Sequence, residues 1–275
     1  MDNNVSGVRV SVVMAVYNAG RRDVLDAAIG SIVHQTMTDW ELLICDDAST
    51  DDTSAWLAQW AQRDPRIRVV RNDVNGHAAK ARNRCIAMAQ GRYVAIMDAD
   101  DICSENRLEA QAAFLDTHES VDFVGLKGCM FTCEPGDSDK TYWYCEAPQP
   151  KDFLMTLPFV HASLMFRREA LERAGGYVEG RKAVRSEDYA MLMRMYALGM
   201  RGVNMDAAVY HIREDAGTYR RRKYRYRIAE CRVKFKGFTQ MGLMPAALPF
   251  AVKPLLIGLL PVGLVEKIKK KVYKT

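Results

Sequence analysis

The sequence predicts an α/β fold, in which helices flank a mostly parallel β-sheet and a basic amphipathic helical tail follows. Three observations predict it. Short β-branched runs alternate with helical patterns at intervals of roughly 25 residues, as in βαβ units. The runs are continuously apolar, which is typical of strands buried on both faces. Charge also divides along the chain, with 23 Lys and Arg against 30 Asp and Glu through Ile212, and 16 against 4 from Arg213 onward.

The elements of the N-terminal half are bounded by clear signals. The first strand, residues 8–16 (VRVSVVMAV), stops at a turn cluster, residues 17–20 (YNAG). An S/T-x-x-D pattern at residues 49–52 predicts a helix start. The other expected elements are helices over 23–35, 53–63 and 78–90, and strands over 40–45, 67–71 and 93–97.

The following part of the chain is less regular. We expect a helix over 108–118, a strand over 121–126, an irregular stretch over 129–150, and a strand over 161–166. A helix over 168–174 should end at Gly175 and Gly176. Ser186 is expected to cap the next helix, which runs to Gly199, and a last strand over 202–210 follows.

The charge division indicates a body, residues 1–215, and a C-terminal extension, residues 216–275. The extension contains the basic, aromatic-rich segment YRRRKYRYRIAECRVKFKGF and ends in EKIKKKVYKT. The longest uncharged run after Lys253, residues 254–265, is shorter than the ~20 residues of a membrane-spanning helix and contains prolines. The flanking lysines favour association with an anionic membrane surface; packing on the protein's own surface is the alternative.

The cysteines and the N-terminus bear on location. The seven cysteines include no CxxC pair, which indicates reduced thiols in a cytoplasmic compartment and gives no metal-site spacing. The N-terminal sequence MDNNVSGVRV lacks the pattern of a secretory signal. We therefore expect a cytoplasmic protein, peripheral on the cytoplasmic face of the inner membrane. The tail contains no recognisable nucleic-acid module, so no nucleic-acid partner is expected.

An acidic cluster follows the strand expected over 93–97. Asp98, Asp100 and Asp101 come where this strand leaves the core. Open α/β sheets bind ligands at the carboxyl ends of their strands, so these carboxylates can hold a divalent cation that neutralises a nucleotide diphosphate. The alternative is an acidic turn whose last Asp caps the next helix. Asp101 suits capping or support, whereas Asp98 and Asp100 suit a ligand.

Six motifs together resemble those of the family 2 glycosyltransferases, in the same order and at similar spacing. They are SVVMAVYN, CDDASTDDT, NGHAAKARN, DADD, HASLMFRREALERAGGY and SEDYAMLMR, and they extend from Val10 to about Arg213. Each motif is short, so the order and spacing carry the resemblance. It implies the Rossmann-like GT-A fold and inverting transfer, of the hexosyltransferase type, from a nucleotide sugar.

The resemblance assigns residues to the nucleoside. Ala15, Tyr17 and Asn18 lie at the end of the first strand, where backbone groups can read a base and the Tyr ring can stack on it. The family pattern assigns Asp47 to the imide N–H of uracil, so a UDP-sugar donor is expected. Asp46 is expected to serve turn hydrogen bonds instead.

The resemblance also assigns residues to the diphosphate and its cation. Arg82, or alternatively Lys80, would offset phosphate charge, although a solvated basic helix face fits both residues as well. Asp98 would contact the ribose or the metal, and Asp100 would bind the Mg²⁺ or Mn²⁺ that bridges the diphosphate. Such an ion stabilises charge on the departing nucleotide.

The general base is expected at Asp188, with Glu187 in support, because direct displacement at the anomeric carbon needs a carboxylate to accept the acceptor's proton. A first-turn acid that only caps its helix is the alternative. His161 matches a position near the acceptor in relatives, and equally a satisfied core histidine. His211 and Arg213 fit loosely where relatives place a phosphate-facing basic residue.

The function predicted from these residues is sugar transfer to a lipid-linked or polysaccharide acceptor in cell-surface glycan synthesis. A nucleotidyltransferase of related fold is one alternative, although AVYNAGRR is a poor phosphate-binding loop. A catalytically silent scaffold on the membrane is another, and the intact Asp98, Asp100 and Asp188 argue against it.

Overall fold

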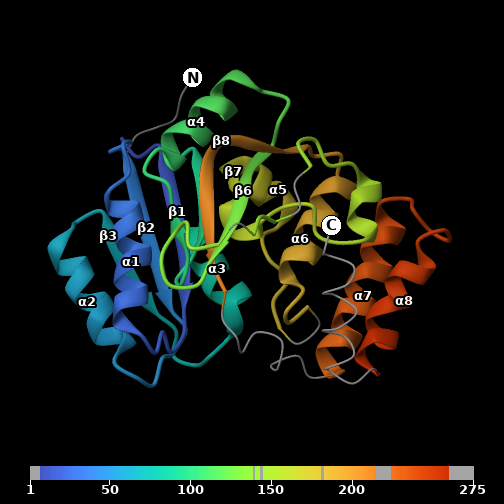
Figure 1. The fold of residues 1–275 in the computed structure, drawn as a ribbon, viewed down its shortest axis with the longest axis horizontal. Helices are drawn as coiled ribbons and strands as arrows, with labels where there is room; N and C mark the ends of the chain where they lie inside the picture. The colour runs from blue at the N-terminus through green and yellow to red at the C-terminus, as the bar shows by residue number, and fades with distance from the viewer. Residues whose placement is uncertain (1–6, 139, 143–144, 181–182, 215–223, 260–275) are drawn as a thin grey trace.

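The computed structural model describes residues 7–138, 140–142, 145–180, 183–214 and 224–259. Within these residues the strands form one eight-stranded sheet, in the order β3-β2-β1-β4-β7-β6-β8-β5 (Figure 1). Four of the seven strand pairings in this sheet are parallel. The prediction of a mostly parallel sheet within an α/β fold is therefore confirmed.

The N-terminal half is a run of parallel βαβ units. Its elements are β1 (Val10–Val16), α1 (Arg22–Val33), β2 (Trp40–Asp46), α2 (Thr53–Arg63), β3 (Ile67–Arg71), α3 (His77–Met88) and β4 (Tyr93–Asp98). Each predicted element of this half is present, with both ends within two residues of the prediction. In the β1 register Val16 lies opposite Asp46 and Ala15 lies opposite Asp98. The carboxyl ends of β1, β2 and β4 therefore lie at one edge of the sheet.

The following half mixes strand directions. Its elements are β5 (Ile102–Cys103), α4 (Arg107–Thr117), β6 (Phe123–Phe131), the 3₁₀ turns η1 (Pro150–Leu154) and η2 (His161–Ser163), β7 (Met165–Arg167), α5 (Arg168–Ala174), α6 (Glu187–Ala197) and β8 (Gly202–Arg213). β7 lies antiparallel between β4 and β6, and β8 runs parallel to β6. The two-residue β5, which the sequence did not predict, pairs antiparallel with β8.

Three predictions in this half were wrong. The strand expected over 161–166 is a 3₁₀ turn followed by β7, because the Ser163 hydroxyl donates to the carbonyl of Val160 at 2.7 Å and favours a local turn. The stretch expected to be irregular from residue 129 begins with the last residues of β6. There the backbone of Cys129 pairs with that of Thr141 in an isolated antiparallel β-bridge. Ser186 occupies the N-cap position of α6 but makes no capping hydrogen bond with its buried side chain.

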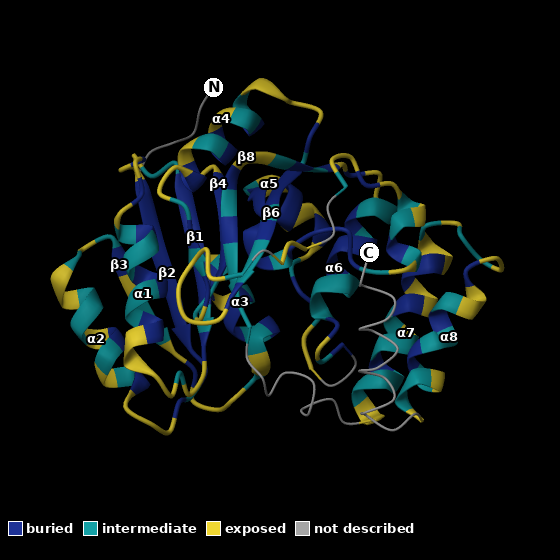
Figure 2. Ribbon diagram, in the orientation of Figure 1, coloured by how far each residue is buried: buried dark blue, intermediate teal, exposed yellow. Residues whose placement is uncertain are grey.

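The sheet has a hydrophobic core on each face. One core joins alternate residues of β1 to the apolar faces of α1, α2 and α4, and the other packs α3, α5 and α6 against the opposite face. Figure 2 shows the strands buried between the two helical layers. Side chains of both faces are buried along β1, as its continuous apolar run predicts.

Polar side chains of α4 are buried where the second half departs from regular pairing. Arg107 is fully buried and donates to the carbonyls of Ile96, at 2.7 Å, and Ala162, at 3.2 Å. Gln111, one turn later, donates to the carbonyls of Val124 and Ser163, each at 2.9 Å. These contacts supply donors to buried backbone carbonyls at the junction of β4, β6 and the turn before β7.

Two C-terminal helices, α7 (Tyr224–Gln240) and α8 (Leu248–Gly258), lie side by side next to α6 (Figure 1). The backbone of α7 approaches α6 closely at Gly237, where a Cβ atom would lie 2.5 Å from the Sδ atom of Met193. Phe238 is fully buried. The described part of the extension thus packs on the body, while residues 216–223 and 260–275 of the predicted tail lie outside the described residues. No helix within the described ranges combines the length and apolar character needed to span a bilayer.

Candidate active site

A cavity of about 600 Å³ opens at the carboxyl edge of the sheet, between β1 and β4. The chain passes from β1 to β2 and β3 on one side and returns to β4 on the other, so the cavity lies at a topological switch point. Most of the side chains predicted to bind the donor line this cavity. They are Ala15, Tyr17, Asn18, Arg82, Asp98 and Asp100. Two predicted site residues, Asp47 and Asp188, are not part of the lining.

The loop after β1 is held by its own polar residue. Asn18 has a left-handed backbone, with φ of 46°, and its Oδ1 accepts a hydrogen bond from the backbone of Thr50 at 2.8 Å. Its backbone N–H donates to the Ser49 hydroxyl at 3.0 Å. Asn18 thus fixes the loop, and the half-exposed Tyr17 ring beside it is available to a ligand in the cavity.

The two acids at the end of β2 serve different parts of the backbone. Asp46 accepts from the backbone of Ser49 at 2.9 Å, which confirms the expected turn hydrogen bond, and pairs with Arg71 at 2.6 Å. Asp47 is buried and accepts from Asn72 at 2.7 Å and from the backbone of Gly76 at 3.0 Å. Because Gly76 itself lines the cavity, Asp47 positions the loop that leads into α3.

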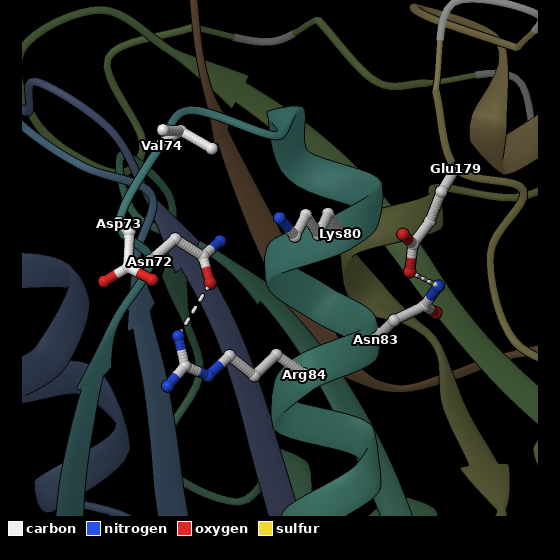
Figure 3. Close-up of a pocket in the computed structure, with 7 residues that line it drawn as sticks. All are labelled: Asn72, Asp73, Val74, Lys80, Asn83, Arg84 and Glu179. Carbon is white, nitrogen blue, oxygen red and sulfur yellow. Dashed lines mark hydrogen bonds between the residues drawn. The ribbon is translucent and has the colours of Figure 1, made fainter.

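Arg82 and Lys80 lie on different faces of α3, as a spacing of two residues in a helix requires. Arg82 is buried, lines the cavity and pairs with Asp98 at 2.7 Å. Lys80 instead lines a separate hollow of about 540 Å³ with Arg84, on the face toward Asn72 (Figure 3). The structure therefore brings Arg82, and not Lys80, to the acids at the end of β4.

Asp98, whose side chain is 37% exposed, is held in its charged form by Arg82. Burial works to raise the pKa of Asp98, but the charge and hydrogen bond of Arg82 outweigh it and lower the pKa below its ordinary value. Burial and the neighbouring charges of Asp98 and Asp100 raise the pKa of Asp101 well above its ordinary value. Asp101 supports the turn by accepting from the backbone of Arg213 at 2.9 Å, and Arg213 Nε donates to the carbonyl of Asp100 at 3.0 Å.

The acids of the cavity fit a hard divalent cation that takes only part of its shell from protein. Asp98 and Asp100 supply oxygen donors, and a carboxylate paired with one Arg keeps acceptor sites for another partner. In the described part of the chain no group of three or more His, Cys, Asp and Glu side chains is placed to hold a metal. An ion at this position would therefore need phosphate oxygens and water to complete its coordination.

The first turn of α6 contributes a second pair of acids. Glu187 lines the cavity, and the neighbouring Asp188 accepts from the backbone of Tyr189 at 2.8 Å. Burial, and then the charge of Glu187, raise the pKa of Asp188 to about 6. A carboxylate with such a pKa accepts a proton far more readily than an ordinary Asp at neutral pH.

Two buried polar atoms of the lining lack partners within the described residues. They are Nε of Arg82 and Oε2 of Glu187. Buried polar groups are rarely left without a hydrogen bond, so these atoms indicate that the cavity receives a polar ligand. Beside them, His161 Nε2 and the Tyr177 hydroxyl lie 2.7 Å apart, and burial and the charge of Arg82 lower the pKa of His161 to about 3. His161 is therefore neutral at physiological pH.

Several residues that line the cavity were not predicted. His77 and Arg185, with φ of 66° each, are non-glycine residues in the left-handed region. Val178, Gly180 and Val184 come from the segment before α6. The adjacency of Arg185 to the SEDYAMLMR motif was the signal in the sequence that could have identified it.

Comparisons with known proteins give a consistent result. The family model described as "Glycosyl transferase family 2" matches residues 11–175. The chain is 33% identical over 267 residues to the putative glycosyltransferase EpsE of Bacillus subtilis, covering 97% of this chain and 95% of EpsE. It is 28% identical over 236 residues to the Escherichia coli UDP-Glc:alpha-D-GlcNAc-diphosphoundecaprenol beta-1,3-glucosyltransferase WfaP, covering 82% of this chain and 84% of WfaP.

Solved structures share the fold. Staphylococcus aureus TarS 1–349 in complex with UDP superposes with a TM-score of 0.67 at 18% identity, covering 90% of this chain and 71% of TarS. The mannosyltransferase PcManGT from Pyrobaculum calidifontis, in complex with GDP-Man and Mn²⁺, gives a TM-score of 0.64 at 22% identity, covering 100% of this chain and 83% of that protein. The GT-A fold implied by the sequence is therefore confirmed.

Proposed function

Because the chain belongs to glycosyl transferase family 2, we propose that it moves a sugar, with inversion, from a UDP-sugar to a hydroxyl of a lipid-linked or polysaccharide acceptor. Membership and the named relatives make it a glycosyltransferase of cell-surface polysaccharide biosynthesis, not the nucleotidyltransferase or silent scaffold that the sequence left open. The observation that carries the finer proposal is the convergence of Tyr17, Arg82, Asp98 and Asp100 on one cavity at the switch between β1 and β4.

In this proposal the base of the donor lies at the end of β1. The Tyr17 ring stacks on it, and the backbone of Ala15 and the loop that Asn18 holds contribute polar groups. The Asp47 carboxylate accepts from the imide N–H of uracil through lone pairs that are not used by its hydrogen bonds with Asn72 and Gly76. UDP in TarS and in the name of WfaP supports this nucleotide, whereas GDP-Man in PcManGT is the alternative.

In this proposal the diphosphate lies beside Arg82 and the acids at the end of β4, which already contact one another. Asp98 and Asp100 would hold a Mg²⁺ or Mn²⁺ ion, for which the Mn²⁺ of PcManGT gives support. Such an ion, when bound, neutralises charge that develops on the departing nucleotide diphosphate. Arg82, with a buried Nε that has no partner in the described residues, adds a fixed positive charge on the same side of the cavity.

Asp188 acts as the general base. As the acceptor oxygen attacks the anomeric carbon, its proton passes to the Asp188 carboxylate, while the bond from that carbon to the diphosphate oxygen breaks and its electron pair leaves with the nucleotide. The raised pKa of Asp188, about 6, makes it a better proton acceptor and still leaves it mostly ionised at neutral pH. Glu187 supports it, because the charge of Glu187 helps to raise that pKa.

We further propose that residues 216–275 bring the catalytic body, residues 1–215, to the cytoplasmic face of the inner membrane. The two C-terminal helices expose apolar side chains, among them Phe235, Leu256 at 63% exposure and Leu259 at 71%. Exposed basic residues of α7, including Arg232 and Lys236, lie in the same hairpin. An apolar surface with basic residues around it suits an anionic membrane that carries a lipid-linked acceptor.

The proposal is tested by the thermal stability of the purified protein with UDP or GDP, with and without Mn²⁺. A ligand at about a hundred times its dissociation constant adds roughly 2.7 kcal/mol, which shifts the melting temperature measurably. We expect UDP to stabilise the protein only with Mn²⁺, and Asp100→Ala to abolish that shift without lowering the melting temperature of the free protein. The matched control is Lys80→Ala, which removes a charge from the other face of α3. This variant should keep the UDP-dependent shift in melting temperature.

Each other outcome has a defined meaning. If only GDP stabilises the protein, the proposed donor nucleotide becomes GDP, and the assignment of Asp47 to uracil is wrong. No stabilisation by either nucleotide at any Mn²⁺ concentration would contradict donor binding in this cavity.

A further inference from the structure

The segment before α6 brings a cation to the cavity that the proposed function has not used. Arg185 lines the cavity together with Asp98 and Asp100, although it comes from a different part of the chain. It is exposed, and it precedes Glu187 by two residues. Its side chain therefore reaches the cavity from the element that carries the general base, and not from the sheet.

The charge of Arg185 is not neutralised by any described residue. Arg82 pairs with Asp98, and Arg213 donates to the carbonyl of Asp100. Within the described part of the chain, Arg185 has no hydrogen bond or ion pair, and its contact is with the ring of Tyr226, whose centroid lies 5.9 Å from the guanidinium carbon. A ring contact orients a guanidinium without using its N–H donors in the ring plane.

The backbone at Arg185 is strained in a way that other cavity residues share. Among the described residues four non-glycine residues have a left-handed φ: Asn18, Ala48, His77 and Arg185. Three of them line this one cavity, and Ala48 directly follows Asp47. Such conformations persist where the surrounding structure holds them, and they gather at ligand sites. The left-handed turn at Arg185 is thus part of how the cavity is built.

We propose that Arg185 binds the diphosphate of the nucleotide donor and stabilises it as it leaves, and that Tyr226 holds Arg185 in place. The inference rests on the proposed function. A planar guanidinium matches two phosphate oxygens with parallel hydrogen bonds. When the bond from the anomeric carbon to the terminal phosphate oxygen breaks, the electron pair goes to that oxygen, and Arg185 donates to the charge that forms there.

The contact with Tyr226 gives α7 a second role. Tyr226 belongs to the segment that the sequence assigns to the membrane extension, and α7 also packs on α6 at Gly237. The extension therefore contributes a residue that positions a group in the cavity. Tyr226 is a positioning residue in this inference, because it acts on the donor through Arg185.

The test uses the full chain and the variant Arg185→Gly. Glycine adopts a φ of 66° without strain, so this variant removes the guanidinium and leaves the turn intact. Calorimetric titration with UDP and Mn²⁺ should show a roughly 10- to 100-fold weaker affinity, because a charged hydrogen-bonded contact is lost. Titration with uridine, which has no phosphate, should show no change. The UDP affinity of Arg185→Lys should fall between those of the wild-type protein and Arg185→Gly, because lysine keeps the charge but loses the planar guanidinium.

Two further comparisons complete the test. Tyr226→Ala should weaken UDP binding by about 2- to 5-fold, and Tyr226→Phe, which keeps the ring, should not. Arg63→Ala is the matched control, since Arg63 is also exposed and lies 5.7 Å from the centroid of Trp60, but on α2.

The results separate this inference from the proposed function. Wild-type protein that binds UDP in a manner that depends on Asp100, with Arg185→Gly behaving like Arg63→Ala, overturns the Arg185 assignment alone. An equal loss of uridine and UDP affinity in Arg185→Gly also overturns it, because that result means a structural effect on the cavity. A wild-type protein that binds neither UDP nor GDP overturns the proposed function and this inference with it.

Discussion

The parallel half of the sheet, β3-β2-β1-β4, and the half formed by β7, β6, β8 and β5 satisfy their backbone groups differently. In the parallel half β1 pairs without interruption with a strand on each side. In the other half β7 has three residues, and the pairing of β6 with β8 shifts register after Leu126. There Arg107 donates from α4 to the carbonyl of Ile96, and Gln111 donates to the carbonyls of Val124 and Ser163. Backbone ladders thus hold the donor side of the cavity, and buried polar side chains hold much of the rest.

This difference has a functional counterpart in the proposed mechanism. In that proposal the base and the cation are bound by residues at the ends of the parallel strands, whereas the proton acceptor, Asp188, lies on a helix of the second half and Arg185 lies just before that helix. Within the second half, substitution of Asp188 should therefore affect turnover, and substitution of Arg185 should affect nucleotide binding.

The largest effect is expected for Asp188→Asn. Removing a general base lowers kcat by about 10²- to 10⁴-fold, and the affinity for UDP should stay unchanged because Asp188 is assigned no contact with the nucleotide. Steady-state rates and calorimetric titration with UDP measure the two quantities. Asp206→Asn, which changes an exposed acid of β8 in the same way, is the control. A variant that keeps its kcat, or loses UDP binding, would contradict the assignment of Asp188 as the general base.

A smaller effect, on stability, is expected for Arg107→Leu. The change leaves the carbonyls of Ile96 and Ala162 buried without donors, so the free energy of unfolding should fall by about 3 kcal/mol. Urea denaturation followed by circular dichroism measures it. Arg63→Leu, an exposed cation on the parallel half, should change the free energy of unfolding by less than about 0.5 kcal/mol. Equal losses in both variants would mean that Arg107 has no special role in the second half.

The smallest effect is a dependence of rate on pH. The pKa of Asp188 is about 6, and the base works only when it is deprotonated, so kcat/KM should rise about tenfold per pH unit below pH 6 and level off above it. Glu187→Gln removes a charge that raises this pKa and should move the limb to lower pH. If the acidic part of the pH profile of kcat/KM is unchanged in Glu187→Gln, a group other than Asp188 determines it.

The raised pKa of Asp188 also determines the direction in which its contribution to stability changes with pH. The raised pKa means that folded Asp188 keeps a proton that the unfolded chain releases between about pH 4 and pH 6. Its contribution to the free energy of unfolding therefore falls as pH rises through that window. Asp188→Asn should remove this part of the dependence on pH.

Local signals explain which elements the sequence could predict. The bounds of α2, β3 and α5 agree with prediction because a turn acid, a Pro-containing turn and Gly175 mark them within the chain itself. β5 could not be predicted, because two residues form a strand only by pairing with β8, which is more than 100 residues away. Likewise, the turn at His161 depends on Ser163, whose hydroxyl also accepts from the backbone of Leu126.

The candidate site follows the same division. Tyr17, Arg82, Asp98 and Asp100 could be predicted because family motifs place them at strand ends or on one helix face, and the structure brings these four together. The choice of Arg82 over Lys80 needed the orientation of α3. Arg185 was not predicted: its adjacency to the SEDYAMLMR motif was a signal, but its place in the cavity depends on a left-handed backbone that no residue type in VRSED requires.

The hydrogen bond from the backbone of Arg213 to Asp101 has a consequence for synthesis of the protein. The growing chain emerges from the ribosome N-terminus first, so β1 to β4 emerge well before β8. The acidic turn after β4 gains its support only when Arg213 has emerged and β8 has paired. The nascent chain can therefore form its first parallel strands before the proposed cation site is complete, and the proposed use of a donor sugar would begin only late in translation.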